Sequence, residues 1–97
     1  MSVIVNMAMF PVDKGDSVSP YVARLLKVIR ASGIAHELNS MATCIEGEWD
    51  EVMAVVTQCY RELEKDCSRV YLTLTADCRK GAPGRMRAKI ESLEAKL

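Results

Sequence analysis

The sequence predicts an α+β fold in which helices cover a small antiparallel sheet. Three observations support this prediction. An apolar, β-rich segment spans residues 3–10, a segment of alternating polarity spans residues 69–79, and segments with apolar residues at helical spacing lie between and after them. Because 97 residues is the size of one domain, we expect a single domain over residues 1–97.

The first strand and the first helix follow from local patterns near the N-terminus. The opening segment is apolar on both alternating faces except at Asn6, which indicates a central strand. Ser19 and Pro20 then predict a helix start, with Ser19 as the N-cap and Pro20 at the first helical position. Gly33 stands where a glycine commonly ends a helix, so we expect this helix over residues 20–32.

A hairpin and a second helix are expected next. The two arms, Ile34–Met41 and Ala42–Glu46, are joined by a turn near residues 39–42. Acidic residues after Gly47 suit the positive end of a helix dipole. The helix that follows has an apolar stripe at helical spacing, formed by Val52, Val55, Val56, Cys59 and Leu63.

The segment Arg69–Arg79 is the clearest period-2 strand of the chain. Its apolar face suits a helix-covered core, and its other face suits a lined pocket or a packed interface. That second face is formed by Tyr71, Thr73, Thr75 and Asp77. After a break at glycines and a proline, a last amphipathic helix carries Met86, Ile90, Leu93 and Leu97.

The resulting order, β-α-β-β-α-β-α, is that of a ferredoxin-like βαββαβ sandwich with an added C-terminal helix. In that arrangement the four antiparallel strands lie in the order 4-1-3-2. Cys44 and Cys78 would then lie on strands separated by the first strand, which makes a disulfide between them a poor expectation. The first two helices would leave one sheet face open, and we expect this apolar face to pack against other copies in a homodimer or homotetramer.

Composition argues against several classes of function. The 13 basic and 13 acidic residues cancel, so no overall field attracts nucleic acid or an anionic membrane. The four cysteines include no CxxC pair, and the single histidine cannot complete a zinc set. We therefore expect neither a metal nor a cofactor. No apolar stretch is long enough to span a bilayer and no cleavable leader is predicted, so we expect a cytoplasmic protein.

The polar residues of the hairpin are the main candidates for a site. Asn39, Ser40 and Thr43 can form hydrogen bonds to a ligand, and Glu46, at the end of a strand, is the best candidate for a working carboxylate. The acidic residues after Glu46 are better explained as a helix N-terminus than as a hard-metal site.

Two further groups of residues are candidates for ligand binding, but each could also have a purely structural role. Ser17 and Ser19 could present hydroxyls at a helix N-terminus, although plain capping is the commoner role for Ser19. Asp77 and Arg79 share a strand face and could pair with each other or with a ligand. His36 has no serine or cysteine partner in a nucleophile motif.

Several stretches together resemble the small thiamine-binding protein family, the YkoF-like group. They are Ser17-Val18-Ser19-Pro20-Tyr21-Val22-Ala23, the hairpin from His36 to Glu48, Arg69-Val70 and Asp77-Cys78-Arg79. The resemblance implies a ferredoxin-like subunit that assembles by sheet packing and binds thiamine or its pyrimidine moiety without turnover. Two positions depart from the pattern: Ala42 stands where the family usually has glycine, and Cys78 where an acidic residue is common.

The leading hypothesis is a non-catalytic binding protein for thiamine or a related pyrimidine such as hydroxymethylpyrimidine. One alternative is a structural or regulatory homo-oligomer without a small ligand, and another is a small enzyme with Glu46 or Asp77 as general base. The expected ligand-binding residues are Ser17, Ser19, Asn39, Ser40, Thr43, Glu46 and Asp77.

Overall fold

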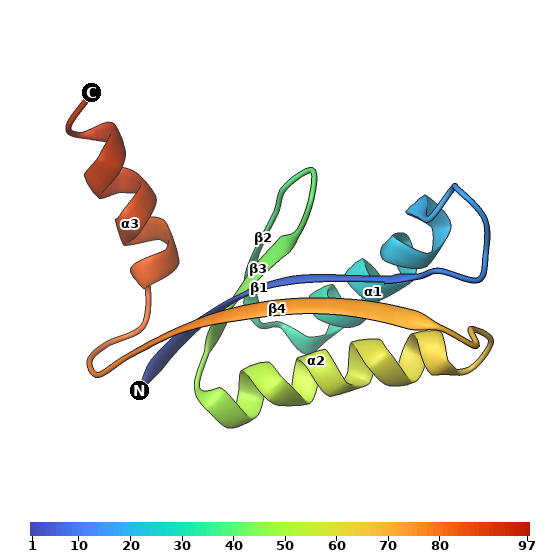
Figure 1. The fold of residues 1–97 in the computed structure, drawn as a ribbon. Helices are drawn as coiled ribbons and strands as arrows, with labels where there is room; N and C mark the ends of the chain where they lie inside the picture. Colours follow the sequence, from blue (N-terminus) through green and yellow to red (C-terminus); the bar gives the residue numbers. More distant parts are fainter.

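The computed structural model describes all 97 residues and shows a four-stranded antiparallel sheet with three helices (Figure 1). The strands lie in the order β2-β3-β1-β4, which confirms the predicted ferredoxin-like topology. In chain order the elements are β1 (Ser2–Pro11), α1 (Ser19–Ser32), β2 (Ala35–Leu38), β3 (Thr43–Gly47), α2 (Trp49–Glu64), β4 (Val70–Arg79) and α3 (Arg85–Glu94).

Strand β1 is central, as its two apolar faces predict, but its two neighbours pair with it over different lengths. It pairs with β4 along its whole length, from Ser2 opposite Arg79 to Pro11 opposite Val70. Its pairing with β3 runs only from Val3 to Met7. The second half of β1 therefore has a strand neighbour on one side only.

The core lies between the sheet and helices α1 and α2. Every second residue of β1, from Val3 to Met9, is buried there, where Leu25 and Ile29 of α1 pack. The whole predicted stripe of α2 is buried in the same cluster. Burial raises the pKa of the Cys59 thiol to about 11, which makes it an inert core side chain, and all four cysteines are unpaired.

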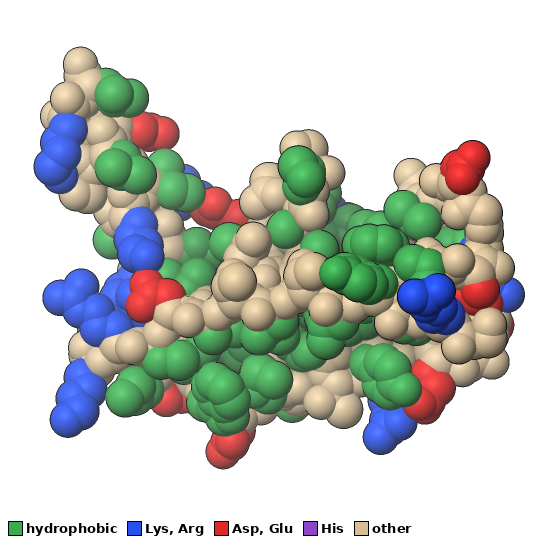
Figure 2. Space-filling view, in the orientation of Figure 1, with side chains coloured by type: hydrophobic (Ala, Val, Ile, Leu, Met, Phe, Trp, Pro, Cys, Tyr) green, Lys and Arg blue, Asp and Glu red, His purple; other side chains and the backbone are tan.

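The opposite sheet face is left largely uncovered. Tyr71 lies beside Phe10 there, with ring centroids 5.6 Å apart, and remains 52% exposed. Helix α3 stands away from the sheet at one end and buries only Met86 (Figure 1). The rest of its predicted apolar stripe stays outside the core, with Leu93 66% exposed. Figure 2 shows apolar side chains along the middle of the molecule and on this projecting helix.

The predicted start of the first helix was wrong by one residue. Val18 is the N-cap, Ser19 is already helical, and no side chain caps this end. The Val18 carbonyl accepts the first helical hydrogen bonds, from the amides of Tyr21 and Val22. Proline is tolerated anywhere in the first turn because those amides have no partner within the helix, so Pro20 did not fix the start. Gly33 ends the helix in a left-handed conformation, as predicted (φ 75°).

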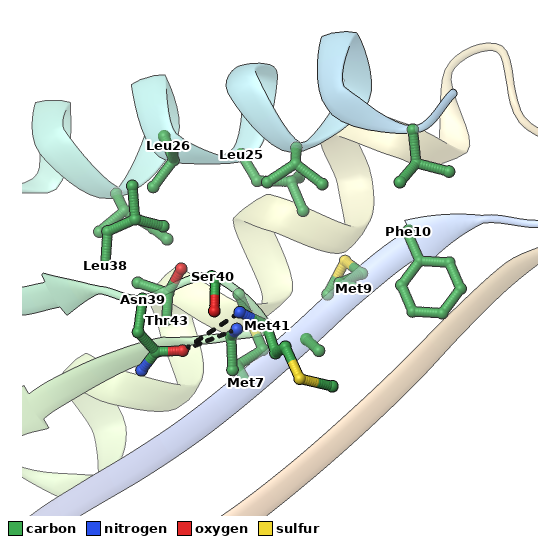
Figure 3. A pocket seen from close by; sticks show the side chains of 15 residues that line it. Met7, Met9, Phe10, Leu25, Leu26, Leu38, Asn39, Ser40, Met41 and Thr43 are labelled. Atoms are coloured by element: carbon green, nitrogen blue, oxygen red, sulfur yellow. Dashed lines mark hydrogen bonds between the residues drawn. The ribbon is translucent and has the colours of Figure 1, made fainter. Parts of the chain in front are cut away.

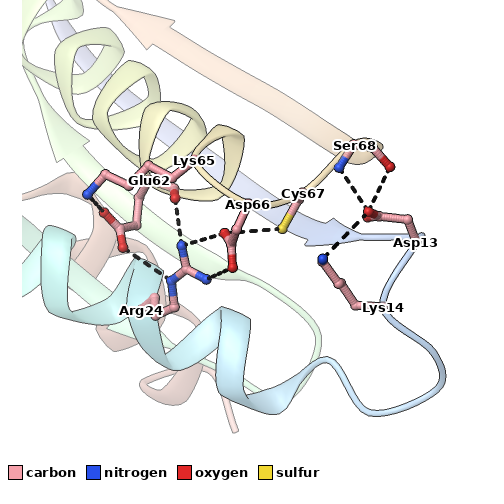
Figure 4. A network of polar contacts seen from close by, with 8 residues as sticks. All are labelled: Asp13, Lys14, Arg24, Glu62, Lys65, Asp66, Cys67 and Ser68. Carbon is pink, nitrogen blue, oxygen red and sulfur yellow. Dashed lines mark hydrogen bonds and ion pairs between the residues drawn. The ribbon is translucent and has the colours of Figure 1, made fainter.

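Polar contacts fasten α1 to the end of α2 (Figure 4). The Arg24 guanidinium donates to Glu62 Oε1 at 3.1 Å and to Asp66 Oδ1 at 2.9 Å. These contacts hold the pKa of Asp66 below its ordinary value, chiefly through the bond from Arg24. Nearby, the Ser68 amide and hydroxyl both donate to Asp13 Oδ2 at 2.8 Å, which anchors the loop after β1.

None of the three helices combines the length and apolarity that crossing a membrane requires.

Candidate ligand-binding site

A cavity of about 170 Å³ lies between α1, the second half of β1 and the β2–β3 turn (Figure 3). Helix α1 contributes Val22, Leu25 and Leu26 to its wall. Figure 3 shows the turn residues facing these leucines across the cavity, with β1 passing beneath. The lining is mostly apolar, and it includes no ionisable side chain.

The cavity opens at the edge of β1 rather than over one face of the sheet. Met7 and Met9 point to the helix side of the sheet, and Ala8 and Phe10 point to the opposite side. All four residues line the cavity, which is possible only where the edge of the strand itself is exposed. This edge is free because β3 begins at Thr43, opposite Met7, and covers nothing beyond it.

The turn that closes the cavity is held by Asn39. Its backbone amide donates to the Ala42 carbonyl at 3.0 Å, and its side-chain Oδ1 accepts from the amides of Ala42 at 3.0 Å and Met41 at 3.4 Å. Because both donors are backbone N–H groups, it is the side-chain oxygen of Asn39 that accepts these bonds. The side-chain nitrogen of Asn39 makes no hydrogen bond within the chain. Asn39 therefore shapes the turn and keeps a donor for another partner.

Thr43 and Ser40 supply hydroxyls at the same wall. Thr43 is the first residue of β3 and is only 6% exposed, yet its hydroxyl makes no hydrogen bond within the chain. The Ser40 hydroxyl is likewise unpaired. No buried side-chain oxygen of the protein lacks a hydrogen-bond partner, so the unpaired Thr43 hydroxyl keeps some accessible surface and is free to bond a ligand atom in the cavity. The three predicted hairpin residues are thus brought together at one cavity.

The two predicted serines lie beside the cavity without lining it. Ser17 and Ser19 are both exposed, and neither side chain forms a hydrogen bond within the chain. The residue between them, Val18, is the one that reaches the cavity wall.

Glu46 lies at the other end of the sheet and is engaged with α3. Its Oε2 accepts from the backbone amides of Arg85 at 2.8 Å and Met86 at 3.3 Å, and from the Ser2 hydroxyl at 3.4 Å. Glu46 is 6% exposed. Along β3 it lies three residues from Thr43, about 10 Å by the rise of a strand. The carboxylate is on the open face, away from the cavity.

Asp77 joins Glu46 at that end of the sheet, because both pair with Ile4 from opposite sides. The Asp77 Oδ2 lies 2.7 Å from Lys89 Nζ and 3.0 Å from Arg85 Nη1. These bonds hold the pKa of Asp77 below its ordinary range, and the bond from Lys89 has a larger effect than the bond from Arg85. The structure therefore groups the predicted residues in two places: Asn39, Ser40 and Thr43 at the cavity, and Glu46 and Asp77 beneath α3.

Sequence reasoning missed the parts of the cavity that come from β1 and α1. Met9, Phe10 and Val22 read as core or strand residues because they are apolar. One signal was available: the first predicted strand is clearly longer than the second arm of the hairpin, so part of its edge had to lack a neighbour.

The protein is therefore a ferredoxin-like domain with a small, mostly apolar cavity at the edge of its sheet. Residues 5–94 match the model of the family described as "Thiamine-binding protein". The chain is similar to a UPF0045 protein from Synechocystis, with 35% identity over 98 residues, 100% of this chain and 81% of the relative. A UPF0045 protein from Mycobacterium tuberculosis is 34% identical over 98 residues, 100% of this chain and 96% of the relative. The chain belongs to the thiamine-binding protein family.

Solved structures show the same fold. A hypothetical protein from Methanocaldococcus jannaschii has a TM-score of 0.87 at 28% identity, covering 96% of each chain. A candidate thiamine biosynthesis or salvage protein from Thermotoga maritima has a TM-score of 0.79 at 24% identity, covering 94% of this chain and 99% of its own. At that identity the second likeness supports the fold alone.

Proposed function

We propose that this protein binds thiamine or a related pyrimidine, such as hydroxymethylpyrimidine, without turning it over, and that the pyrimidine ring occupies the cavity. The observation that carries the proposal is the apolar cavity closed by Asn39, Ser40 and Thr43, in a chain that belongs to the thiamine-binding protein family.

The size of the cavity favours a single ring. Apolar cavities of about 150 Å³ in other proteins hold one benzene molecule. A cavity of about 170 Å³ therefore matches a substituted six-membered ring better than the whole of thiamine, which has two rings and a hydroxyethyl tail. If thiamine binds, its thiazolium would extend out of the cavity.

The lack of charged side chains in the cavity wall also favours the pyrimidine ring of thiamine over its thiazolium. A cationic thiazolium buried without a counter-ion would suffer a large desolvation penalty, and no carboxylate lines the cavity. A neutral aminopyrimidine needs only hydrogen bonds for its ring edge, which the turn can supply. We therefore expect hydroxymethylpyrimidine to bind at least as tightly as thiamine.

Binding without chemistry is favoured because no general base lines the cavity, so nothing in its wall would activate the hydroxyls of Ser40 and Thr43 as nucleophiles. The carboxylates considered for an enzyme, Glu46 and Asp77, accept bonds from α3 at the other end of the sheet. The enzyme alternative would require a pyrimidine substrate to bind over the open face instead.

Calorimetric titration with thiamine and with hydroxymethylpyrimidine tests the proposal. Saturable binding of either compound supports it. The absence of heat with both, on folded and correctly assembled protein, would eliminate it in favour of the second candidate function, a structural or regulatory homo-oligomer.

Self-association through the open sheet face is also proposed. It is supported by the exposed Tyr71, which packs beside the half-buried Phe10 on a face that α1 and α2 do not cover. Whether copies form dimers or tetramers, and whether the protein is cytoplasmic, stay predictions.

A further inference from the structure

The edge of β1 that borders the cavity has one unmatched residue. The β1–β3 ladder ends with Met7 opposite Thr43. In the same register the next pair on this edge would be Met9 opposite Met41, but Met41 lies in the turn held by Asn39. No residue of β3 therefore stands opposite Met9.

The direction of the Met9 main chain follows from the pairing on the other side. The Val12 amide donates to the Arg69 carbonyl at 2.9 Å, which continues the β1–β4 ladder. In an antiparallel ladder a residue directs its N–H and C=O to one neighbour, and the next residue directs them to the other. The amides of Phe10 and Ala8 thus face β4, and the N–H and C=O of Met9 face the cavity.

This free edge is too short for a peptide strand. On one side of Met9 the main chain of Met7 is already paired with Thr43, and on the other side Pro11 has no N–H to donate. An added strand would gain a single complete pair of bonds. A small planar molecule with a donor and an acceptor side by side needs no more than one residue.

We propose that the main-chain N–H and C=O of Met9 recognise the aminopyrimidine edge of the ligand. The amino group would donate to the Met9 carbonyl, and the adjacent ring nitrogen would accept from the Met9 N–H. This inference rests on the proposed function and deepens it, because it explains how a mostly apolar cavity selects an amino-substituted ring. The turn residues would then contact the remaining ring atoms.

Amide hydrogen exchange followed by NMR tests the geometry first without ligand and then with it. In the free protein the Met9 amide should exchange at least about tenfold faster than its neighbours Ala8 and Phe10, which are paired with β4. Saturating hydroxymethylpyrimidine should slow the Met9 amide by about tenfold or more and leave its neighbours unchanged. If the ligand binds and the Met9 amide keeps its free rate, the inference is overturned while the proposed function stands.

Two controls address the donor and the acceptor separately. A ligand analogue with methyl in place of the amino group should bind about tenfold more weakly or worse, because the Met9 carbonyl loses its donor. In synthetic protein, an amide-to-ester replacement at residue 9 should weaken binding similarly while keeping the fold, whereas the same replacement at Phe10 should lower stability through its bond to β4. Unchanged affinity in both the analogue and the residue-9 ester contradicts the inference, and no binding of any probe contradicts it together with the proposed function.

Discussion

The Glu46 carboxylate lies 2.8 Å from the backbone nitrogen of Arg85, at the start of α3. The same oxygen also accepts from the next amide and from the Ser2 hydroxyl. A negative charge at this position meets two amides that have no partner within the helix, and it also suits the positive end of the helix dipole. Glu46 thus anchors a helix that otherwise buries only Met86.

We expect Glu46→Ala to destabilise the attachment of α3 and to leave ligand affinity unchanged. Removing this buried acceptor should cost about 1–3 kcal/mol, because two amides lose their partner. Glu46→Gln keeps an acceptor oxygen and should cost less. Urea unfolding gives the stability, and calorimetry with hydroxymethylpyrimidine gives the affinity. A variant of normal stability that no longer binds would instead place this carboxylate at the ligand.

Replacing Thr43 by valine should weaken pyrimidine binding about tenfold, the worth of one hydrogen bond. Stability should change little, since this hydroxyl has no partner in the chain and the two side chains have similar shape. Thr57→Val is a matched control, because its hydroxyl bonds the Met53 carbonyl on α2, far from the cavity. Equal affinities for the two variants would remove Thr43 from the site.

The contacts of Arg24 should make stability depend on pH. Because the pKa of Asp66 is lowered in the folded state, its contribution is complete above the unfolded value of about 4 and is lost as pH falls through the lowered pKa. The Arg24→Gln protein should therefore have a lower melting temperature than wild type at neutral pH. This gap in melting temperature should narrow in acid. Part of the gap should persist, since the bond from Arg24 to the Glu62 carbonyl does not titrate. Thermal melts across this range measure it, and a gap that widens in acid would refute the assignment.

If the open face mediates self-association, Tyr71→Glu should dissociate the assembly. It would place a charge among apolar side chains of the interface. Tyr60→Glu is a suitable control, because Tyr60 is also an exposed tyrosine but lies on α2. Sedimentation velocity distinguishes the outcomes: identical species for both variants would show that the assembly does not use this face.

Periodicity predicted the strands and helices because burial on one face leaves a clear mark on the sequence. The stripe of α2 and the alternation along β4 are examples, and the hairpin turn near Asn39 followed from its small polar residues. The partner of Glu46 could not be predicted in the same way. Its bonds go to backbone amides near residue 85, and main-chain donors carry no residue-type signal.

The cavity shows a similar limit. Its polar wall was predicted from Asn39, Ser40 and Thr43, but its apolar wall could not be told from the core, since both use the same residue types. Ser17 and Ser19 read as site residues from the motif, and the orientation of α1 instead directs Val18 and Val22 to the cavity. That orientation depends on packing between α1 and the sheet rather than on local sequence.

A pair of matched variants on α1 tests whether the ring of a pyrimidine occupies this cavity. Val22 is half-buried and lines the cavity, whereas Val28 is half-buried on the same helix and does not. Calorimetric titration of Val22→Phe and Val28→Phe with hydroxymethylpyrimidine should show lost binding for the first and near wild-type affinity for the second. Wild-type affinity in a folded Val22→Phe protein would show that the pyrimidine ring does not occupy this cavity.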